Sequence, residues 1–349
     1  MLEITDLKTY YNSPEGPVHA VDGVDIELRE NEVLGLLGES GCGKTTLAKS
    51  IIQLLPREGY IEHGSIRYDE IDIAELSESE INKQIRWKEI SMIPQNAMNG
   101  FDPVYTVAEQ IIEVIQAHEP KTSKKEAKER GKDLFEKLGI DRYRIDDYPH
   151  QFSGGMAQRA MIALSLAVSP SILLADEPTT GLDMIIQRRI LELLRDITEE
   201  RDLSIIMITH DISAAVELCD RIAVMYGGRV VEVADTETIL KDPHHPYTMG
   251  LNQAFPRFSD TRSELISIPG EPFDPVDPED ACRFAPRCPF AETECWAGQP
   301  TPQKVGANHR VECVRTDEKD YMQEEANRKE IWERMKRTSE GQPLAGDSQ

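Results

Sequence analysis

The chain of 349 residues is long enough for one large domain with a smaller additional module. Its formal net charge of −24 argues against general nucleic-acid binding and against unaided adhesion to anionic lipid, because both need a basic surface. The first six residues lack the character of a secretory signal, and no stretch approaches the roughly 18 apolar residues of a membrane span. We therefore expect a soluble protein, whose role at any membrane would require a separate membrane partner.

The surplus of acidic residues has two explanations. In a salt-rich cytoplasm, ions would screen the mutual repulsion of the carboxylates, and this halophilic explanation is the one we favour. The alternative is an ordinary acidic bacterial protein, which the composition alone does not exclude.

Residues 1 to about 32 alternate between apolar and polar positions around a turn at 12–16, a pattern typical of antiparallel strands. One aromatic side chain in this stretch, Tyr11, could stack on an adenine ring. The alternative for Tyr11 is packing on the surface of the strand.

The apolar run 33–37 then leads into a glycine-rich segment that fits the phosphate-loop pattern G-x-x-x-x-G-K-[ST]. Apolar residues recur at helical spacing from Leu47 to Leu55, so the segment lies between a strand and a helix. Backbone N–H groups of such a loop surround a phosphate, and the helix N-terminus favours its negative charge. The predicted nucleotide-binding residues are Gly38, Ser40, Gly41, Cys42, Gly43, Lys44, Thr45 and Thr46. Of these, Lys44 can reach the β- and γ-phosphates and the Thr45 hydroxyl can ligate Mg²⁺.

Strands and helices alternate beyond this loop. We predict strands at 64–68, 90–94, 171–175 and 203–208, and a helical, charged region from about 104 to 165 that closes with an apolar helix at 157–168. This alternation predicts an α/β fold with a mostly parallel sheet, whose ligands bind beyond the carboxyl ends of the strands.

Polar side chains follow two of those strands, 171–175 and 203–208. Asp176 could hold Mg²⁺ through water, and Glu177 could orient the water that attacks the γ-phosphate. His210 follows a later strand, and by itself it would more often be a packed histidine than a catalytic one. The simpler alternative for the acidic pair is an ordinary turn at the end of a strand.

With Gln95, Ser153-Gly154-Gly155 and Asp183 in order between these motifs, the chain resembles an ATP-binding cassette (ABC) ATPase over residues 1 to about 315. The resemblance implies a P-loop NTPase with a mostly parallel sheet core, an antiparallel N-terminal β-subdomain and a helical signature subdomain at about 96–165. We accordingly expect an ATP-binding domain at 1–240, a four-cysteine C-terminal region at 241–315, and a polar tail at 316–349 that is partly helical or disordered.

The resemblance also implies roles for single residues. Tyr11 would stack on adenine, Gln95 would sense Mg²⁺ and the membrane partner, and His210 would contact the γ-phosphate. Asp183 would lie at the seam of an ATPase dimer. The signature residues that would grip the ATP of the opposite subunit are Ser153, Gly154, Gly155 and Gln158.

Further segments resemble the ATPase subunits of oligopeptide and dipeptide importers, namely 152–159, His245-Pro246-Tyr247-Thr248 and 282–289. This implies a transport ATPase, a translocase, on the cytoplasmic face of the membrane. Its partners would be a paralogous ATP-binding subunit, two permease subunits and, through them, a solute-binding protein. Peptide, nickel and sugar all remain open as cargo. The alternative is a soluble ABC ATPase acting on nucleic acid or ribosomes, which the acidic charge disfavours.

Four of the six cysteines lie in the C-terminal region, at Cys282, Cys288, Cys295 and Cys313. Their gaps are wider than those of usual structural zinc sites, whereas four thiolates with a Cys-Pro step also suit an iron–sulfur cluster. The resemblance to importer ATPases favours a [4Fe–4S] cluster, with zinc or no metal as alternatives. We expect this region to act separately from the ATP site, and His309 to be structural rather than a ligand.

Overall fold

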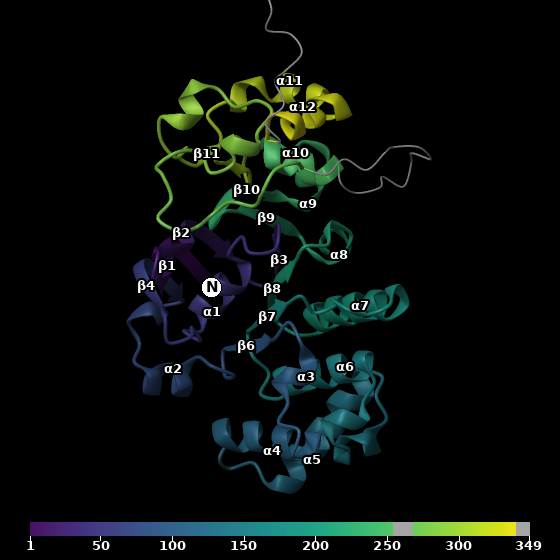
Figure 1. Ribbon diagram of the computed structural model, residues 1–349. Coiled ribbons are helices and arrows are strands. Elements are labelled where there is room, and N and C mark those ends of the chain that lie inside the picture. The colour runs from purple at the N-terminus through teal and green to yellow at the C-terminus, as the bar shows by residue number, and fades with distance from the viewer. Residues whose placement is uncertain (254–267, 340–349) are drawn as a thin grey trace, which may run out of the picture.

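The computed structural model describes residues 1–253 and 268–339, which form two sheets with helices around them (Figure 1). The smaller sheet is antiparallel, with strand order β2-β1-β4-β5. Its strands are β1 Leu2–Ser13, β2 Gly16–Leu28, β4 Gly59–Tyr68 and β5 Ile71–Asp72. The antiparallel N-terminal strands predicted from alternation are therefore present.

The larger sheet has the strand order β11-β12-β10-β9-β3-β8-β7-β6. Its parallel part consists of β3 Val33–Leu37, β6 Ile90–Ile93, β7 Ile172–Asp176, β8 Ser204–Thr209 and β9 Arg221–Tyr226. Four of these strands are buried along their whole length, because layers of helices and strands cover both faces.

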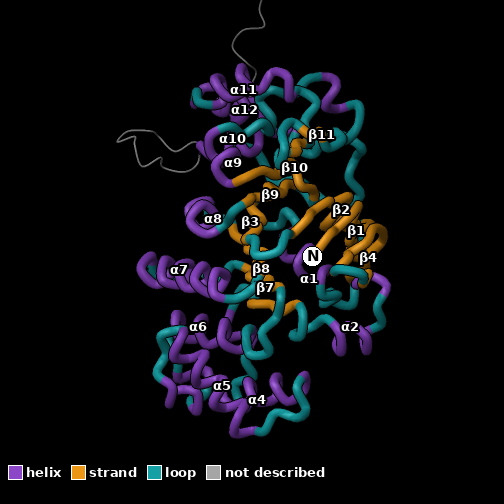
Figure 2. The backbone as a smooth tube through the Cα atoms, turned by 180° about the vertical axis from the view of Figure 1, so that it is seen from behind, coloured by secondary structure: helices purple, strands orange, loops and turns teal. Residues whose placement is uncertain are grey.

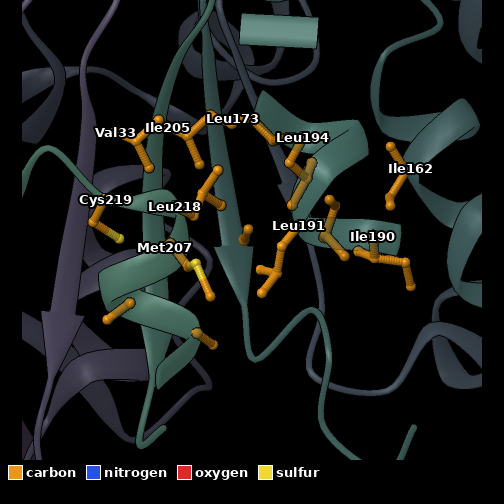
Figure 3. Close-up of a cluster of buried hydrophobic side chains, with 14 of the residues drawn as sticks. Val33, Ile162, Leu173, Ile190, Leu191, Leu194, Ile205, Met207, Leu218 and Cys219 are labelled. Atoms are coloured by element: carbon orange, nitrogen blue, oxygen red, sulfur yellow. The ribbon is translucent and has the colours of Figure 1, made fainter. Parts of the chain in front are cut away.

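Successive residues of a central strand enter two different cores. On β8, Ile205 and Met207 belong to the cluster around α7 Met184–Glu200 and α8 Ile212–Leu218, while Ile206 and Ile208 belong to the cluster around α1 Lys44–Ile51. The two views of the molecule place α7 and α8 on the side of the sheet opposite to α1 and the N-terminal sheet (Figures 1 and 2). Figure 3 shows the first core, including Leu191, Leu194, Ile205, Met207 and Leu218.

A helical subdomain follows β6 and lies at one end of the molecule (Figure 1). It contains α3 Ala97–Gly100, α4 Val107–His118, α5 Lys124–Lys137 and α6 Gly154–Ser165. A capping box at Thr106 and the Ser123 side chain satisfy the N–H groups at the starts of α4 and α5. The short helix α2 Glu78–Gln84 lies outside this group, after the N-terminal sheet.

The C-terminal region continues the larger sheet. Strand β10 Arg229–Asp235 pairs with β9 on one side and with β12 Arg310–Val311 on the other, and β12 pairs with β11 Gln303–Lys304. The helices α9 Thr236–Lys241, α10 Pro246–Gln253, α11 Lys319–Ala326 and α12 Lys329–Ser339 accompany it at the opposite end from the signature subdomain. The division at 240 stays a prediction, and the hydrogen-bonded ladder runs across it.

Some sequence-based expectations differ from the structure in detail. The helix after the phosphate loop ends at Ile51, so Leu54 is half exposed instead of lying on a buried helix face. The tail packs in part, because the indole of Trp332 is buried and donates to the carbonyl of Ala326. The end of this tail, residues 340–349, lies outside the described residues. Among the helices of the described ranges, none is both long and apolar enough to span a bilayer.

Candidate functional site

The glycine-rich loop lies between the end of β3 and the start of α1. Gly43 occupies the N-cap of α1 with a left-handed φ of 103°, and a Cβ there would lie 2.1 Å from the carbonyl oxygen of Ala20. A Cβ on Gly38 would lie 2.2 Å from the carbonyl oxygen of Met225. Backbone of other strands therefore presses on the loop at these two positions, and only glycine fits there.

Lys44 is buried within the loop that it follows. Its Nζ donates to the carbonyl oxygens of Gly38 and Glu39, each at 2.8 Å. These bonds hold the ammonium group beneath the loop, where a nucleotide phosphate would compete for it. The structure thus places Lys44 where the motif predicts a phosphate-binding cation.

Two oxygen ligands for a magnesium ion meet next to Lys44. The Thr45 hydroxyl donates to the carboxylate of Asp176, with distances of 2.9 and 3.2 Å to its two oxygens. Hydroxyl, carboxylate and phosphate oxygens are the donors that Mg²⁺ prefers, so the residues fit this ion. Burial raises the pKa of Asp176, the bond from Thr45 opposes that shift, and the charge of Glu177 adds to it. A bound cation would favour the charged form of this carboxyl group.

Glu177 follows Asp176, and side chains from three segments of the chain contact its carboxylate. Its Oε2 accepts hydrogen bonds from Gln95 and Thr180, each at 3.0 Å, and its Oε1 lies 3.0 Å from Nδ1 of His210. The backbone of Glu177 is left-handed, with a φ of 48°, an unfavourable conformation that the surrounding contacts maintain. The structure therefore brings together all three residues predicted to be catalytic, Gln95, Glu177 and His210.

The electrostatics of this group keep Glu177 ionised. Burial acts to raise its pKa, but the hydrogen bonds from His210, Gln95 and Thr180 outweigh burial, and the net pKa lies below its ordinary value. A carboxylate has about four acceptor sites, and three are in use. One site on Oε1 is left for a water molecule, as the predicted role requires.

Tyr11 lies beside the loop on β1. Its hydroxyl is 3.1 Å from the Thr46 hydroxyl oxygen, and its ring limits the space at Gly59. The structure thus brings Tyr11 to the nucleotide loop, and its stacking on adenine stays a prediction.

The signature residues lie at the start of α6. Ser153 is the N-cap residue and makes no side-chain cap bond, so its hydroxyl and the exposed Gly154 are open to an external group. Gly155 and Gln158 are buried, and a Cβ on Gly155 would lie 2.8 Å from Ile186 of α7. The buried Gln158 therefore does not share the exposed surface of Ser153, and its predicted contact with a second subunit stays a prediction.

Asp183 caps α7 close to that segment. Its Oδ1 accepts from the backbone N–H groups of Ile185 and Ile186. The next two side chains are unusually exposed for apolar groups, Met184 at 86% and Ile185 at 69%. Such a patch beside the signature segment is suited to a protein contact.

The four C-terminal cysteines line one cavity, although up to 31 residues separate them. All are free thiols, and burial raises the pKa of Cys288 well above its usual value, with a further rise from the other three cysteines. Burial likewise raises the pKa of Cys313 to about 11. In the described ranges, no three His, Cys, Asp or Glu side chains are close enough to bind one metal ion. This arrangement therefore supports neither the zinc alternative nor the predicted [4Fe–4S] cluster, and the cluster stays a prediction.

His309 lies outside that cavity. Its Nε2 is 2.7 Å from the fully buried carboxylate of Glu232, which also accepts from the backbone N–H groups of His244 and His245. This contact agrees with the expectation that His309 is structural.

Two residues that hold the phosphate loop were not predicted from the sequence. Arg287 binds both carboxylate oxygens of Glu39, at 2.7 and 2.9 Å, and the Tyr247 hydroxyl accepts from the Glu39 N–H at 3.0 Å. The segments carrying Tyr247 and Arg287 were visible only as markers of a resemblance. The separate role expected for the C-terminal region stays a prediction, although two residues of that region, Tyr247 and Arg287, contact Glu39 in the loop.

Comparison with known proteins gives matches along the chain. The family model "ABC transporter" matches residues 21–180, and "Oligopeptide/dipeptide transporter, C-terminal region" matches residues 231–295. The oligopeptide transport ATP-binding protein AppD of Bacillus subtilis is 41% identical over 91% of this chain and 97% of its own length. The dipeptide transport ATP-binding protein DppD of Haemophilus influenzae is 38% identical over 90% and 94%.

Solved structures are similar over the nucleotide-binding part. A dimeric ATP-binding cassette in a post-hydrolysis state, bound to ADP and Pi, has a TM-score of 0.62 and 28% identity, covering 68% of this chain and 99% of that one. CbiO1 of Clostridium perfringens, described as part of an ABC transporter complex, has a TM-score of 0.59 and 29% identity, covering 69% and 90%. The predicted ABC cassette fold is confirmed.

Proposed function

Since this chain belongs to the family of ATP-binding subunits of oligopeptide and dipeptide ABC transporters, we propose that it hydrolyses ATP to power peptide import through a separate membrane permease. The observation that carries this proposal is the carboxylate of Glu177, fixed by Gln95 and His210 beside the Thr45–Asp176 pair. Similarity to peptide-transport proteins favours peptide over nickel or sugar as the cargo. Nothing favours the alternative of a nucleic-acid or ribosome-associated ATPase.

In the proposed reaction, the loop N–H groups and Lys44 bind the phosphates, while Tyr11 packs against adenine. Thr45 and Asp176 would hold Mg²⁺, directly or through water, and the ion would neutralise charge on the β- and γ-phosphates. Glu177 orients the attacking water and takes up its proton, and His210 positions that carboxylate. Ser153 and Gly154 are exposed for the γ-phosphate of ATP in an opposite subunit.

In the proposed assembly, this chain lies at the cytoplasmic face of the membrane, together with a paralogous ATP-binding subunit, on two membrane permease subunits. A solute-binding protein acts through the permease. Gln95 would report the state of the nucleotide to the permease. The exposed apolar pair Met184–Ile185 next to Asp183 supports a dimer seam at this position.

The composite site gives a test of the proposed function. We expect the isolated chain to hydrolyse ATP slowly, because each nucleotide needs Ser153 and Gly154 of a second cassette. Reconstitution with the partner ATPase and permease should raise the rate and make it respond to peptide-loaded binding protein. Full activity of a demonstrated monomer, independent of concentration, would contradict the composite site.

We further propose that the four-cysteine cavity holds a [4Fe–4S] cluster. Support comes from four free cysteine thiols around one cavity, since four cysteine thiolates are the usual ligand set of a [4Fe–4S] cluster. Such a cluster, when bound, would cross-link four distant points of a region with little regular structure. The cysteines would bind as thiolates, and the positive charge of the iron would offset the cost of burying these anions, whereas burial alone favours the protonated thiols.

The cluster has a direct test. Protein purified without oxygen should be brown and should contain iron and sulfide. Cys288→Ser should lose the colour, because one of the four cluster ligands is missing. Residues 270–315 should also become more sensitive to protease, because the cluster no longer cross-links them. The matched control is Cys219→Ser, since Cys219 is also buried and lies outside the cavity. Stoichiometric zinc without iron would contradict the proposal.

The net charge of −24 supports adaptation to a salt-rich cytoplasm as a separate proposal. At about 1 M salt the Debye length falls to about 3 Å, so repulsion between surface carboxylates is screened. The melting temperature should therefore rise markedly with KCl, and sucrose of equal osmolality should raise it less. A flat or falling response to KCl would favour the ordinary acidic protein.

A further inference from the structure

The guanidinium group of Arg287 forms a two-pronged ion pair with Glu39, the second residue of the phosphate loop. Nη1 and Nη2 of Arg287 lie 2.7 and 2.9 Å from the two carboxylate oxygens of Glu39. The arginine itself is fixed by the carbonyl oxygens of Ile268 and Pro269 and lies against the ring of Tyr226. Because Arg287 is only 6% exposed, this geometry is far better defined than that of a surface ion pair.

Tyr247 of α10 holds the same loop residue from its backbone side. The Tyr247 hydroxyl accepts a hydrogen bond from the Glu39 N–H at 3.0 Å, and the ring is fully buried against Tyr226 and Phe284. Glu39 is thus held by its backbone and by its carboxylate, in both cases by residues more than 200 positions away. The carbonyl of Glu39 in turn accepts from Lys44.

These contacts lead directly to the cysteine cavity. Arg287 is the last residue of the short 3₁₀ turn Ala285–Arg287, between Cys282 and Cys288, and Phe284 before it lines the cavity. Backbone bonds from Ala285 to Cys282 and from Cys288 to Ala285 tie the turn to the two cysteines. The position of the arginine therefore depends on the same turn that presents the thiols.

The charge of Glu39 gives this contact a consequence for nucleotide binding. A phosphate loop attracts anions, and a free carboxylate within it would repel the phosphates of ATP. Arg287 cancels that charge and holds the carboxylate toward the C-terminal region. The pair thus removes an electrostatic obstacle that the loop sequence would otherwise contain.

We propose that Arg287 and Tyr247 are positioning residues for ATP binding, through which the C-terminal cysteine region holds the phosphate loop and neutralises Glu39. This deepens the proposed function and depends on it only in that the loop binds ATP. Removing the arginine leaves an unpaired carboxylate in the loop, so ATP binds more weakly. Removing both charges restores binding.

The experiment compares Arg287→Met, Glu39→Gln and the double variant by titration of the full-length protein with Mg-ATP. Arg287→Met should raise the Kd about tenfold, which corresponds to about 1.4 kcal/mol. Glu39→Gln should bind ATP as tightly as the wild type or more tightly. The double variant should recover to within about threefold of the wild type, a coupling that a double-mutant cycle measures. Tyr247→Phe, which loses one hydrogen bond, should have a smaller effect than Arg287→Met.

Arg315→Met is the matched control. Arg315 is also mostly buried, lines the cysteine cavity and bonds to the carbonyl oxygen of Phe290 and to Glu318, so its loss disturbs the same region away from the loop. Its Kd for Mg-ATP should stay within about threefold of the wild type. In the assembled transporter, Arg287→Met should raise the KM for ATP and leave kcat within about twofold.

Three results would overturn the inference. One is an unchanged Kd in Arg287→Met, and another is an equal loss in Arg315→Met, which would indicate general damage to the C-terminal region. The third is a double variant as weak as Arg287→Met, because the charge of Glu39 would then be irrelevant. If the wild-type protein itself fails to bind Mg-ATP, that result contradicts the proposed function and not this inference.

Discussion

Glu177→Gln is expected to lower ATP turnover in the assembled transporter by roughly 10²–10⁴-fold while ATP still binds. The amide keeps the size of the side chain and can still bond to Thr180, but it cannot take a proton from water. It also replaces an acceptor that serves Gln95, Thr180 and His210 together. The phosphate loop and the Thr45–Asp176 pair are unchanged, so the Kd for Mg-ATP should stay close to that of the wild type.

Single-turnover hydrolysis and nucleotide titration would separate these two effects. The control is Glu200→Gln, which changes an exposed glutamate at the end of α7 that pairs with Lys137. That variant should hydrolyse ATP at the wild-type rate. A Glu177→Gln protein with near wild-type turnover would show that another group activates the water.

Gly43→Ala is expected to destabilise the protein and to abolish tight nucleotide binding. The new methyl group would lie 2.1 Å from the carbonyl oxygen of Ala20, and the residue has a φ of 103°. Left-handed strain of about 1–2 kcal/mol and a forced displacement of about 1–3 kcal/mol should together lower the free energy of unfolding by about 2–5 kcal/mol. Because the displacement moves the start of α1, the loop N–H groups no longer point toward the bound phosphates.

Gly41→Ala separates the two contributions. Gly41 also has a positive φ, of 82°, but a Cβ there has no neighbouring atom within 4 Å. Its free energy of unfolding should fall only by the left-handed strain, about 1–2 kcal/mol. Urea unfolding of both variants would measure the difference, and equal losses would contradict the close approach at Ala20.

The residues of the ATP site could be found from sequence because each lies in a short local pattern. The phosphate loop follows β3, while Asp176 ends β7 and Glu177 follows it, and the parallel arrangement of these strands brings their ends together. A local sequence pattern does not give the distances between side chains in the folded protein. The bonds of Glu177 with Gln95 and His210 cross 82 and 33 residues of chain, and they appear only after the sheet forms.

The contacts between the loop and the C-terminal region were beyond sequence analysis for the same reason. Nothing local to Glu39 indicates Arg287, 248 positions later, because periodicity and turn signals describe neighbouring residues. The extent of the larger sheet was also missed. Strand β10 follows a tight turn at Gly227–Gly228 and is buried at five consecutive positions, so it shows no alternation, and β12 is only two residues long.

The pairing of β12 with β10 has a consequence for dissection of the molecule. In a protein truncated after about residue 240, the backbone N–H and C=O groups along one edge of β10 would be unpaired. Unpaired strand edges form hydrogen bonds with strands of other molecules. The cut would also remove the hydrogen-bond partners of the Glu232 carboxylate, which are His309 and the backbone N–H groups of His244 and His245. The isolated cassette would therefore be prone to self-association, and its aggregation would say nothing about the transporter from which it came.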